Sequence, residues 1–550
     1  MPMEANLQVL PHERVPLTAL RDFSTLFVTY ATEYEPLAAF YAGDYRDPAV
    51  RRERAVRAAA HPRDRATLVK VLEEQNERWG LDAATRKHIE ALRDPESVAL
   101  VTGQQVGLLG GPLFTLYKAL TVGKLARQLT DELDRPVVPV FWLAGEDHDY
   151  EEVASVTVLQ GAEPVTLRLE RPDPNYAGPV GRLALPETIR TLLDELADLL
   201  PPTEFQEPLL ALLQETYRPG VSFQDAFARL LKRLVPEDVG LVLIDPDDAR
   251  LKALARPLFE RELTDWETAH ARLEAVSREL AARYHVQVQT RPLNLFLLEG
   301  HRRIPLDAEP DGFHLRGEGP VLSQTEALQL LQEAPERFSP NALLRPLYQD
   351  WLLPTLAYVA GPAEIAYWAQ LKPLYEWAGL PMPLVYPRAL MLLVEPRIAR
   401  WLERYHLRPE ALQEEPDRLF HRLVKEQLDG ELEAAFEEAR RQLRELGVRL
   451  RPLVERVDPS LGPATEAWAT GLEHELDRFW ARVLKAGKRR EETLRNQLVR
   501  ARNSLFPNGV LQERVLSPVY FLNKYGPELP RRLQQVLSTD TSALQVVYLQ

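Results

Sequence analysis

The sequence predicts an α/β protein, with a parallel-sheet core interrupted by insertions and a C-terminal antiparallel coiled-coil arm. Up to about residue 392, short apolar runs that end in glycine or polar residues alternate with segments of helical periodicity, as in a parallel sheet covered by helices. Beyond that point the chain is rich in Leu, Glu, Arg and Gln, and heptad spacing replaces the strand signals. We expect a helical N-terminal part (1–95), a core (96–392), an arm (393–506) and a C-terminal segment (507–550) that returns to the core.

The clearest element of the core is a strand–helix–strand unit. Val98–Thr102 is apolar without alternation, as in a strand buried on both faces. After the loop 103–111, Pro112 suits the first turn of a helix, and this helix should end before Asp134-Arg135-Pro136. Val137–Ala144 is expected to be the next strand, which Gly145–Asp149 follows.

Polar clusters follow both strands of this unit, Gln104-Gln105 after the first and Glu146-Asp147-His148-Asp149 after the second. Ligands of open parallel sheets bind at the carboxyl ends of the strands, so we take Gln104, Gln105, His148 and Asp149 as catalytic candidates. Glycines let a ligand approach the backbone, and a helix start favours an anion. The alternative is a tight connection without a ligand. The binding candidates in this unit are Thr102, Gly103, Gly107, Gly110, Gly111, Lys118, Glu146 and Asp147.

Two insertions are expected in the core, at about 155–235 and 250–340. The expected elements are strands in 155–169, helices in 187–235, a third buried strand at 240–244, helices in 251–283 and a small β insertion at 286–289, 293–298 and 302–306. Asp248 follows the third strand and is either a site carboxylate or a helix cap. The sheet should resume at 356–360 and at 383–386, with a helix over 365–377 between them.

Further candidates lie in or beside the later strand ends. Arg345, Lys372 and Arg388 are cations that suit a carboxylate or a phosphate, although each alone is more typical of a surface or structural ion pair. Gly361, Glu364 and Tyr367 are the binding candidates that follow the strand at 356–360.

The arm shows two heptad seams. The first runs from Leu432 to Leu453, Asp458–Pro463 interrupts the pattern, and the second runs from Trp468 to Leu505, which predicts an antiparallel hairpin. We expect a homodimer through this arm; the alternative is an arm that folds only on itself. The segment after the hairpin contributes further candidates, namely Asn508, Gln512, Glu513 and Arg514.

Composition limits the classes of function. The net charge of −14 and the pI near 5.5 argue against a nucleic-acid partner, which more often requires a basic field. No apolar run approaches the roughly 18 residues that span a bilayer, and the N-terminus lacks the features of a signal peptide, so we expect a cytoplasmic protein without a membrane partner. The absence of cysteine excludes disulfides, thiolate metal sites and a cysteine nucleophile.

Several familiar motifs are missing, including the GxxxxGK[ST] phosphate loop, the GxGxxG fingerprint and HExxH. Adjacent residues seldom ligate one ion together, so no metal site is expected at Glu146–Asp149, and His148 is interpreted as a phosphate-contacting donor or a proton carrier. Two alternatives remain open: a metal-dependent hydrolase or nucleotidyltransferase that uses Glu146–Asp149, and a non-catalytic assembly protein built on the coiled coil.

Four long motifs together resemble the BshC family, the cysteine-adding enzymes of bacillithiol biosynthesis. They are Thr102–Lys118, Val140–Val153, Leu344–Leu371 and Leu505–Val515, and the resemblance covers nearly the whole chain. It implies a Rossmann-like core, connective insertions and a coiled-coil arm that dimerises. It also implies a ligase that joins the carboxylate of cysteine to the amine of glucosaminyl-malate.

The family is similar to class I aminoacyl-tRNA synthetases, which implies that ATP activates the cysteine carboxylate. The resemblance then places phosphates or a nucleotide, ATP or ADP, on Gln104, Gln105 and Gly107–Gly111, and a cysteine ammonium or a Mg²⁺ on Glu146 and Asp149. The HIGH and KMSKS sequences are absent as such, and GQQVG stands where the first is expected, so the nucleotide rests on analogy of fold. A second possible nucleotide site lies near the base of the coiled coil, at Asn508 and 512–514.

Overall fold

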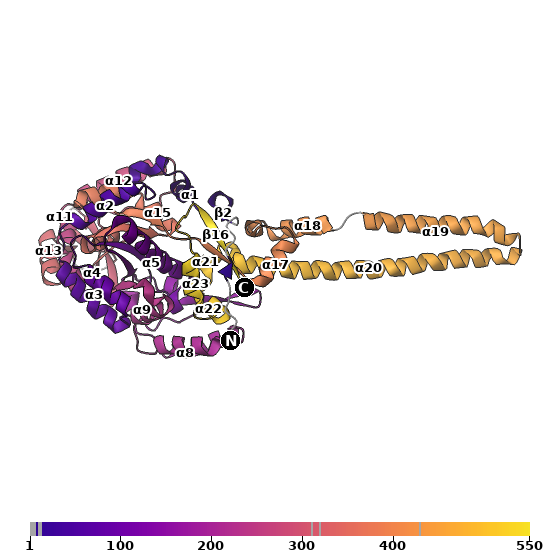
Figure 1. Cartoon of the computed structure of the whole chain (residues 1–550), viewed down its shortest axis with the longest axis horizontal. Helices are drawn as coiled ribbons and strands as arrows, with labels where there is room; N and C mark the ends of the chain where they lie inside the picture. Colours follow the sequence, from indigo (N-terminus) through magenta and orange to yellow (C-terminus); the bar gives the residue numbers. More distant parts are fainter. Residues whose placement is uncertain (1–6, 9–13, 310–311, 318–320, 428–430) are drawn as a thin grey trace. The chain divides into compact units, whose positions relative to one another are not determined.

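The protein forms two compact units, shown in Figure 1. The computed structural model describes residues 7–8, 14–309, 312–317, 321–427 and 431–550. The first unit comprises residues 1–396 and 510–550, and the second comprises 397–509. Within the described ranges, no helix combines the length and the apolar character that a membrane crossing requires.

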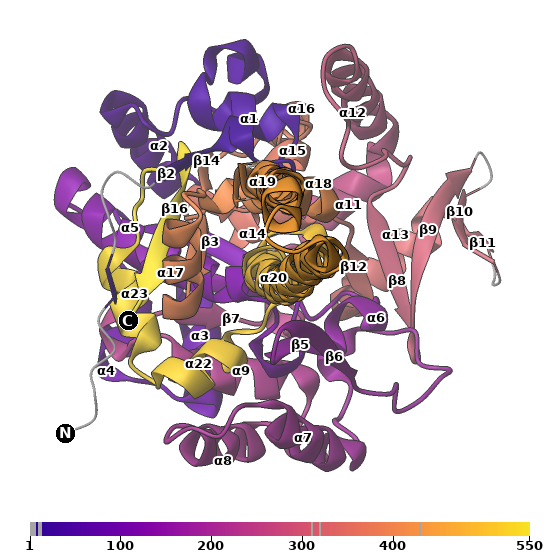
Figure 2. The ribbon, with the colours of Figure 1, turned by 90° about the vertical axis from the view of Figure 1, so that its right-hand side faces the viewer.

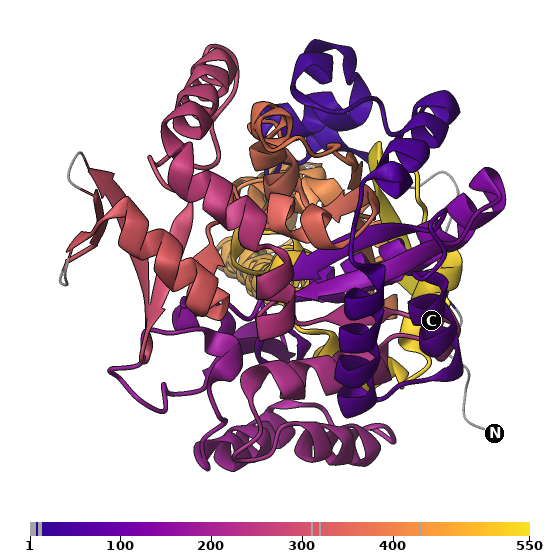
Figure 3. The same cartoon turned by 90° about the vertical axis from the view of Figure 1, so that its left-hand side faces the viewer.

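A five-stranded parallel sheet is the centre of the first unit. Its order is β14-β13-β3-β4-β7, and every neighbouring pair is parallel, which confirms the predicted α/β class. The strands are β3 (Val98–Gln104), β4 (Val137–Leu143), β7 (Val242–Ile244), β13 (Thr355–Ala360) and β14 (Leu384–Pro387). Nearly all their residues are buried, since helices surround the sheet (Figures 2 and 3). All five carboxyl ends therefore lie along one edge.

The predicted strand–helix–strand unit is confirmed. The helix α5 (Leu113–Leu133) connects β3 to β4 and packs against both strands. Pro112 is its N-cap, one residue before the first turn, and the helix ends where Asp134 adopts a left-handed conformation with φ 50°. Because residues before proline disfavour the helical region, the chain leaves the helix ahead of Pro136.

The N-terminal part and the C-terminal segment meet in a second sheet that the sequence did not predict. After four helices, α1 (Thr25–Thr32), α2 (Pro48–Ala60), α3 (Arg65–Trp79) and α4 (Ala83–Ala91), the chain enters the core. The C-terminal β16 (Ala543–Leu549) pairs in parallel with β15 (Met391–Val394), and antiparallel with β1 (Leu7–Gln8) and β2 (Arg14–Pro16). β1 and β2, of two and three residues, are too short to show a periodicity; β16, of seven residues, is a longer strand that the sequence analysis missed.

The first insertion contains a hairpin of β5 (Ser155–Gln160) and β6 (Glu163–Arg168), followed by α7 (Thr188–Leu199), α8 (Gln206–Thr216) and α9 (Phe223–Leu234). The second begins with α10 (Ala249–Leu254), α11 (Arg256–Thr264) and α12 (Trp266–Ala281), and Asp248 caps α10. An antiparallel sheet follows in the order β11-β10-β9-β8-β12 (Figure 2). Its strands are β8 (Leu295–Glu299), β9 (Arg302–Glu309), β10 (Gly312–Leu315), β11 (Val321–Leu322) and β12 (Phe338–Pro340), and α13 (Gln324–Glu333) lies between the last two.

Two predictions about the core were wrong. Residues 286–289 form no strand; instead, the side-chain amide of Gln370 donates to the carbonyl oxygen of Val288 (2.9 Å) and accepts from its N–H (3.3 Å). The expected single helix at 365–377 is two helices, α15 (Pro362–Trp368) and α16 (Lys372–Ala378). Pro373 has no N–H to continue the first helix, but it suits the first turn of the second.

The second unit contains the predicted antiparallel hairpin. The helices of this unit are α17 (Pro396–Arg404), α18 (Pro416–Gln427), α19 (Glu431–Glu455) and α20 (Gly462–Leu505), and the last two form the hairpin. The ring of Phe436 on α19 lies 4.6 Å from that of Trp480 on α20. The ion pair of Arg440 with Asp477, at 2.7 Å, also joins the two helices.

Candidate active site at the carboxyl ends of the sheet

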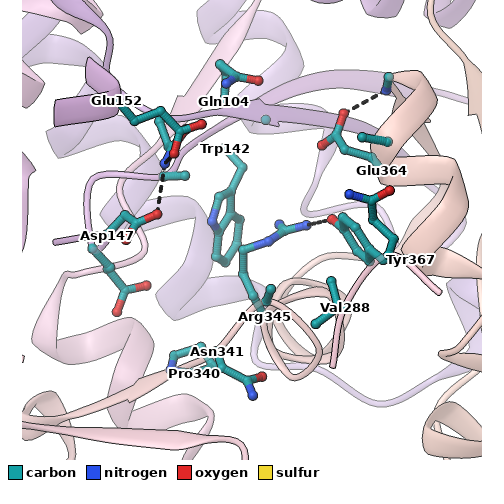
Figure 4. A pocket seen from close by; sticks show the side chains of 18 of the residues that line it. Gln104, Trp142, Asp147, Glu152, Val288, Pro340, Asn341, Arg345, Glu364 and Tyr367 are labelled. Atoms are coloured by element: carbon teal, nitrogen blue, oxygen red, sulfur yellow. Dashed lines mark hydrogen bonds between the residues drawn. The ribbon is translucent and has the colours of Figure 1, made fainter. Parts of the chain in front are cut away.

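A cavity of about 770 Å³ lies at the carboxyl ends of the central strands, a size that suits small-molecule reactants. Figure 4 shows Asp147 and Glu152 on one side, Glu364 and Tyr367 on the other, and Arg345 between them. Thirteen of the predicted residues line it, namely Gly103, Gln104, Gln105, Lys118, Glu146, Asp147, His148, Arg345, Gly361, Glu364, Tyr367, Arg388 and Arg514.

Lys118 and Glu364 form a buried ion pair between α5 and α15, with Nζ 2.5 Å from Oε2. Lys118 also donates to the carbonyl oxygen of Gly103 (2.7 Å) and to Oε1 of Gln104 (3.0 Å). Burial lowers the pKa of Lys118, partly offset by Glu364. Burial opposes the charge of Glu364 as well, but Lys118 outweighs it and lowers the pKa of this carboxyl. The short contact and the additional hydrogen bonds favour the charged pair.

Three arginines that line the cavity have no carboxylate partner within the described part of the chain: Arg291, Arg345 and Arg514. Arg345 opens the helix α14 (Arg345–Leu352), and its Nη2 donates to the hydroxyl of Tyr367 at 3.2 Å. Its guanidinium lies 5.4 Å from the ring centre of Tyr358. The positive charge of these side chains is therefore available to an anionic ligand.

Arg388, after β14, is held differently. Its two terminal nitrogens donate to Glu513 at 2.6 and 2.9 Å, and the residue is only 2% exposed. Its Nε is buried and has no hydrogen-bond partner among the residues that the structure describes. Because buried donors are nearly always satisfied, this N–H is an additional candidate contact for an anion.

Asp147 lies on the side of the cavity opposite Glu364 and Tyr367 (Figure 4). It accepts from Gln105 Nε2 (2.8 Å) and from the backbone N–H of His148 (2.7 Å). Gln105 Nε2 also donates to Glu152 at 2.8 Å, and Nη1 of Arg303 lies 3.9 Å from Asp147 Oδ1. Burial alone would raise the pKa of Asp147, but the backbone N–H of His148, the charge of Arg303 and the side chain of Gln105 hold it well below its usual value. Asp147 is therefore an anion that faces the cavity.

The four residues Glu146–Asp149 do not converge on one point. Glu146 is buried in an ion pair with Lys252 of α10. Asp149 does not line the cavity; it caps the short helix α6 (Tyr150–Val153) by accepting from Glu152 N–H at 3.3 Å. Across the described ranges, no group of three or more His, Asp or Glu side chains is arranged to hold a metal ion. The geometry gives no support to a metal-dependent hydrolase at this cluster.

Gly107, Gly110 and Gly111 of the loop after β3 do not line the cavity, in contrast to the expected contact with phosphate. The N–H groups of Gly107, Gly110 and Gly111 donate to the carbonyl oxygens of Gln105, Gly107 and Leu108. Gly110 and Gly111 have φ values of 87° and 69°, and a Cβ on Gly107 would lie 2.9 Å from Gly111 Cα. The tight turn between β3 and α5 therefore explains these glycines without a ligand.

The remaining predicted residues have structural contacts of their own. Thr102, Gln512 and Glu513 are buried and bonded to Val359, Leu393 and Arg388, respectively. Asn508 belongs to the second unit, in the turn after α20, where its φ is 55°. Lys372 donates to the carbonyl oxygen of Ala39 and does not line the cavity.

Sequence reasoning missed the part of the lining that comes from the second insertion: the segment 287–291, Phe296, Arg303 and Asn341. These residues lie 144 to 198 positions after the end of β4, and no motif connects them to it. The one available signal is Arg302-Arg303 at the start of a predicted strand. Trp142 and Tyr358, inside predicted strands, also line the cavity.

These features define the class of the protein, a Rossmann-like α/β protein with a ligand cavity at its strand ends and a coiled-coil arm. Two family models match the chain. The "Bacillithiol biosynthesis BshC, N-terminal Rossmann-like domain" matches residues 11–389, and the C-terminal coiled-coil domain of the same description matches 391–549. The chain belongs to the BshC family, which confirms the resemblance.

Curated relatives span nearly the same length. A protein of Salinibacter ruber is 47% identical over 97% of this chain and 98% of its own. Proteins of Chlorobaculum tepidum and Symbiobacterium thermophilum are each 36% identical, over 97% and 95% of this chain and 98% and 96% of their own. Each of the three is named "Putative cysteine ligase BshC".

Proposed function

We propose that the protein is a ligase of bacillithiol biosynthesis that joins the carboxylate of cysteine to the amine of glucosaminyl-malate. Membership of the BshC family supports this proposal. The observation that carries it is a cavity lined both by arginines without a carboxylate partner among the described residues and by an aspartate held as an anion. The arginines suit the malate carboxylates, and Asp147 suits the ammonium group of cysteine.

The reaction requires activation, since a carboxylate does not condense with an amine in water. We propose that an oxygen of the cysteine carboxylate attacks the α-phosphorus of ATP and releases pyrophosphate. The amine of glucosaminyl-malate then attacks the carbonyl carbon, releases AMP and loses a proton. ATP would bring a Mg²⁺ bound mainly by its phosphates, for which one carboxylate such as Glu152 suffices.

Arg345 has a defined part in this proposal. It lies between the two sides of the cavity in Figure 4, and among the described residues its hydrogen bonds go to neutral oxygens, the hydroxyl of Tyr367 and the side-chain amide of Gln349. A guanidinium held by neutral groups keeps its charge for a reactant that becomes more negative in the transition state, where preorganised charge contributes most to catalysis.

A deletion strain tests the proposal. The strain is expected to lack bacillithiol and to accumulate glucosaminyl-malate, and the wild-type gene should restore the thiol. Arg345→Met should reduce restoration at least tenfold, because it removes the unpaired charge. Arg190→Met, at an exposed arginine that pairs with Glu187, should restore fully. Normal bacillithiol in the deletion strain would contradict the proposal.

The purified protein tests the activation step. Incubated with cysteine, glucosaminyl-malate and ATP, it is expected to form AMP and pyrophosphate in proportion to the amide. ADP and phosphate would instead indicate an acyl phosphate, and amide formation without nucleotide turnover would exclude ATP as the activating substrate.

We also infer a cytoplasmic homodimer. The arm presents exposed apolar side chains, including Val448 of α19 (73% exposed) and Val457 in the turn after it (83% exposed), and apolar residues left outside the seam between two helices favour a partner. The small reactants and ATP fit the cytoplasm.

A further inference from the structure

Arg303 of β9 extends from the second insertion to the polar cluster that follows β4. Its Nε donates to Ser339 Oγ (3.0 Å) and its Nη2 to the carbonyl oxygen of Pro340 (2.8 Å). The guanidinium lies 3.8 Å from the ring centre of Phe296, and the side chain is only 7% exposed. With these groups held, Nη1 has a fixed direction and lies 3.2 Å from Nδ1 of His148.

This contact determines where the imidazole carries its proton. A guanidinium has only donors and stays protonated in proteins. The contact is therefore a hydrogen bond only if Nδ1 of His148 presents its lone pair. A neutral imidazole whose Nδ1 accepts a hydrogen bond carries its proton on Nε2. Nε2 is thus a donor, on a side chain that lines the cavity and is 43% exposed.

Asp147 competes for the same nitrogen. Its Oδ1 lies 3.5 Å from Nδ1 of His148, and a proton on Nδ1 would bind there. However, Oδ1 already accepts the backbone N–H of His148 at 2.7 Å, and Oδ2 accepts Gln105 Nε2 at 2.8 Å. The contact with Arg303 is the shorter of the two. Asp147 also compensates the charge of Arg303, since Nη1 and Oδ1 are 3.9 Å apart.

We propose that Arg303 is a positioning residue that holds His148 in the Nε2–H form, so that His148 donates a hydrogen bond to an anionic oxygen of a reactant. His148 then does not remove a proton from the attacking amine. The inference deepens the proposed function and rests on it only for the identity of that oxygen, on the cysteine carboxyl group or on a phosphate. A donor fixed before the reaction stabilises charge without reorganisation.

The form of the imidazole is measured in the full-length protein without substrates. Nitrogen-15 NMR of histidine-labelled protein distinguishes protonated from lone-pair nitrogens, and a His148→Gln spectrum assigns the signals. The wild-type protein is expected to show His148 with a lone pair on Nδ1 and a proton on Nε2 at neutral pH. In Arg303→Met the proton should move to Nδ1, towards Asp147. Arg302→Met, on the neighbouring position of β9, should leave the signals unchanged.

A proton on Nδ1 in the wild-type protein, or no change in Arg303→Met, would overturn the proposal. Because no substrate is present, either result is independent of whether the protein is a cysteine ligase. The wild-type spectrum alone suffices if the Arg303 variant does not fold.

Activity provides a second readout. A glutamine amide donates a hydrogen bond near the position of Nε2 but is no base, so His148→Gln should retain at least tenfold more kcat than His148→Ala. Loss of a preorganised donor typically costs about 10²–10³-fold in kcat, which is the loss expected for His148→Ala. Equal loss in the two variants would indicate a base and would overturn the proposal.

Discussion

Each buried charge at the cavity either has a protein partner or is left for a ligand. Lys118 is paired with Glu364, and Arg388 with Glu513. Burying a pair costs desolvation that its attraction barely recovers, so such pairs contribute position more than stability. Among the described residues, the hydrogen-bond partners of Arg345 are neutral. The paired residues therefore give the cavity its shape, and the unpaired arginine gives it the capacity to bind an anion.

Glu262 shows how burial changes the pKa of a carboxyl group that is not paired with a cation among the described residues. It is fully buried on α11, its Oε1 accepts two hydrogen bonds from Asn294, and its Oε2 has no partner among the described residues. Burial raises its pKa from 4.5 to about 7. The unfolded chain therefore releases this proton at a lower pH than the folded protein does. The contribution to stability is fully present below about pH 4.5 and is lost as the pH rises to about 7.

Glu262→Gln is expected to remove this dependence. A shift of this size corresponds to roughly 3 kcal/mol, so the variant should gain about that much relative to the wild type between pH 4.5 and pH 8. Urea unfolding at both pH values measures the gain. Glu260→Gln, on the exposed side of the same helix, is the control and should follow the wild type. A constant difference between Glu262→Gln and the wild type would show that folding does not shift the pKa of Glu262.

Secondary-structure elements were predictable from the sequence where they are long and where a neighbouring element covers a continuous face. β3, α5 and β4 met both conditions, as did the hairpin of α19 and α20. Val286–Gln289 alternates like a strand, but its partner is the side chain of Gln370, which lies 82 residues after Val288. A local pattern cannot distinguish a side-chain partner from a strand.

The sequence predicted the part of the site that follows the strands of the parallel sheet, but not the part from the second insertion. Residues that follow β3, β4 and β13 could be placed at one edge, because parallel strands end together. Arg303 could not, since only the tertiary fold brings β9 to the end of β4. The glycines after β3 were misleading in another way, because a tight turn and a phosphate site require the same left-handed backbone.

Gln370 controls one wall of the cavity. It is fully buried, bonds both backbone groups of Val288 and donates to Ser277 Oγ at 2.9 Å. Gln370→Ala should release the segment 287–291, which lines the cavity. We expect faster hydrogen exchange in that segment, measured by mass spectrometry, and a several-fold higher KM with a smaller change in kcat. Gln329→Ala removes an exposed amide that bonds Glu333 and should change neither the hydrogen exchange of 287–291 nor the KM. Unchanged hydrogen exchange in Gln370→Ala would show that this segment keeps its position without the amide of Gln370.

The whole molecule combines a unit that carries the cavity with a unit made of helices alone. One sheet joins the distant parts of the first unit, because β16 at the end of the chain pairs with strands from both its start and its middle. The second unit has much of its surface in two long helices, and a hairpin of two helices can bury only one seam. Its exposed apolar residues are consequently the part of the molecule that favours a second copy.

The homodimer is tested by removing apolar surface from the arm without touching the contact between its helices. Val448 and Val457 are 73% and 83% exposed, whereas Phe436 packs on Trp480 inside the hairpin. Burying a valine side chain contributes about 1.5 kcal/mol or more, so Val448→Lys with Val457→Lys should weaken the dimer at least tenfold. Light scattering after size exclusion should give the wild type twice the chain mass of 62.8 kDa and the variant a mass that falls towards one chain on dilution.

Val56→Lys, the same substitution at a 56% exposed valine of the first unit, is the control and should stay dimeric. A wild-type monomer would contradict the homodimer, and an undisturbed dimer in the double variant would place the interface elsewhere.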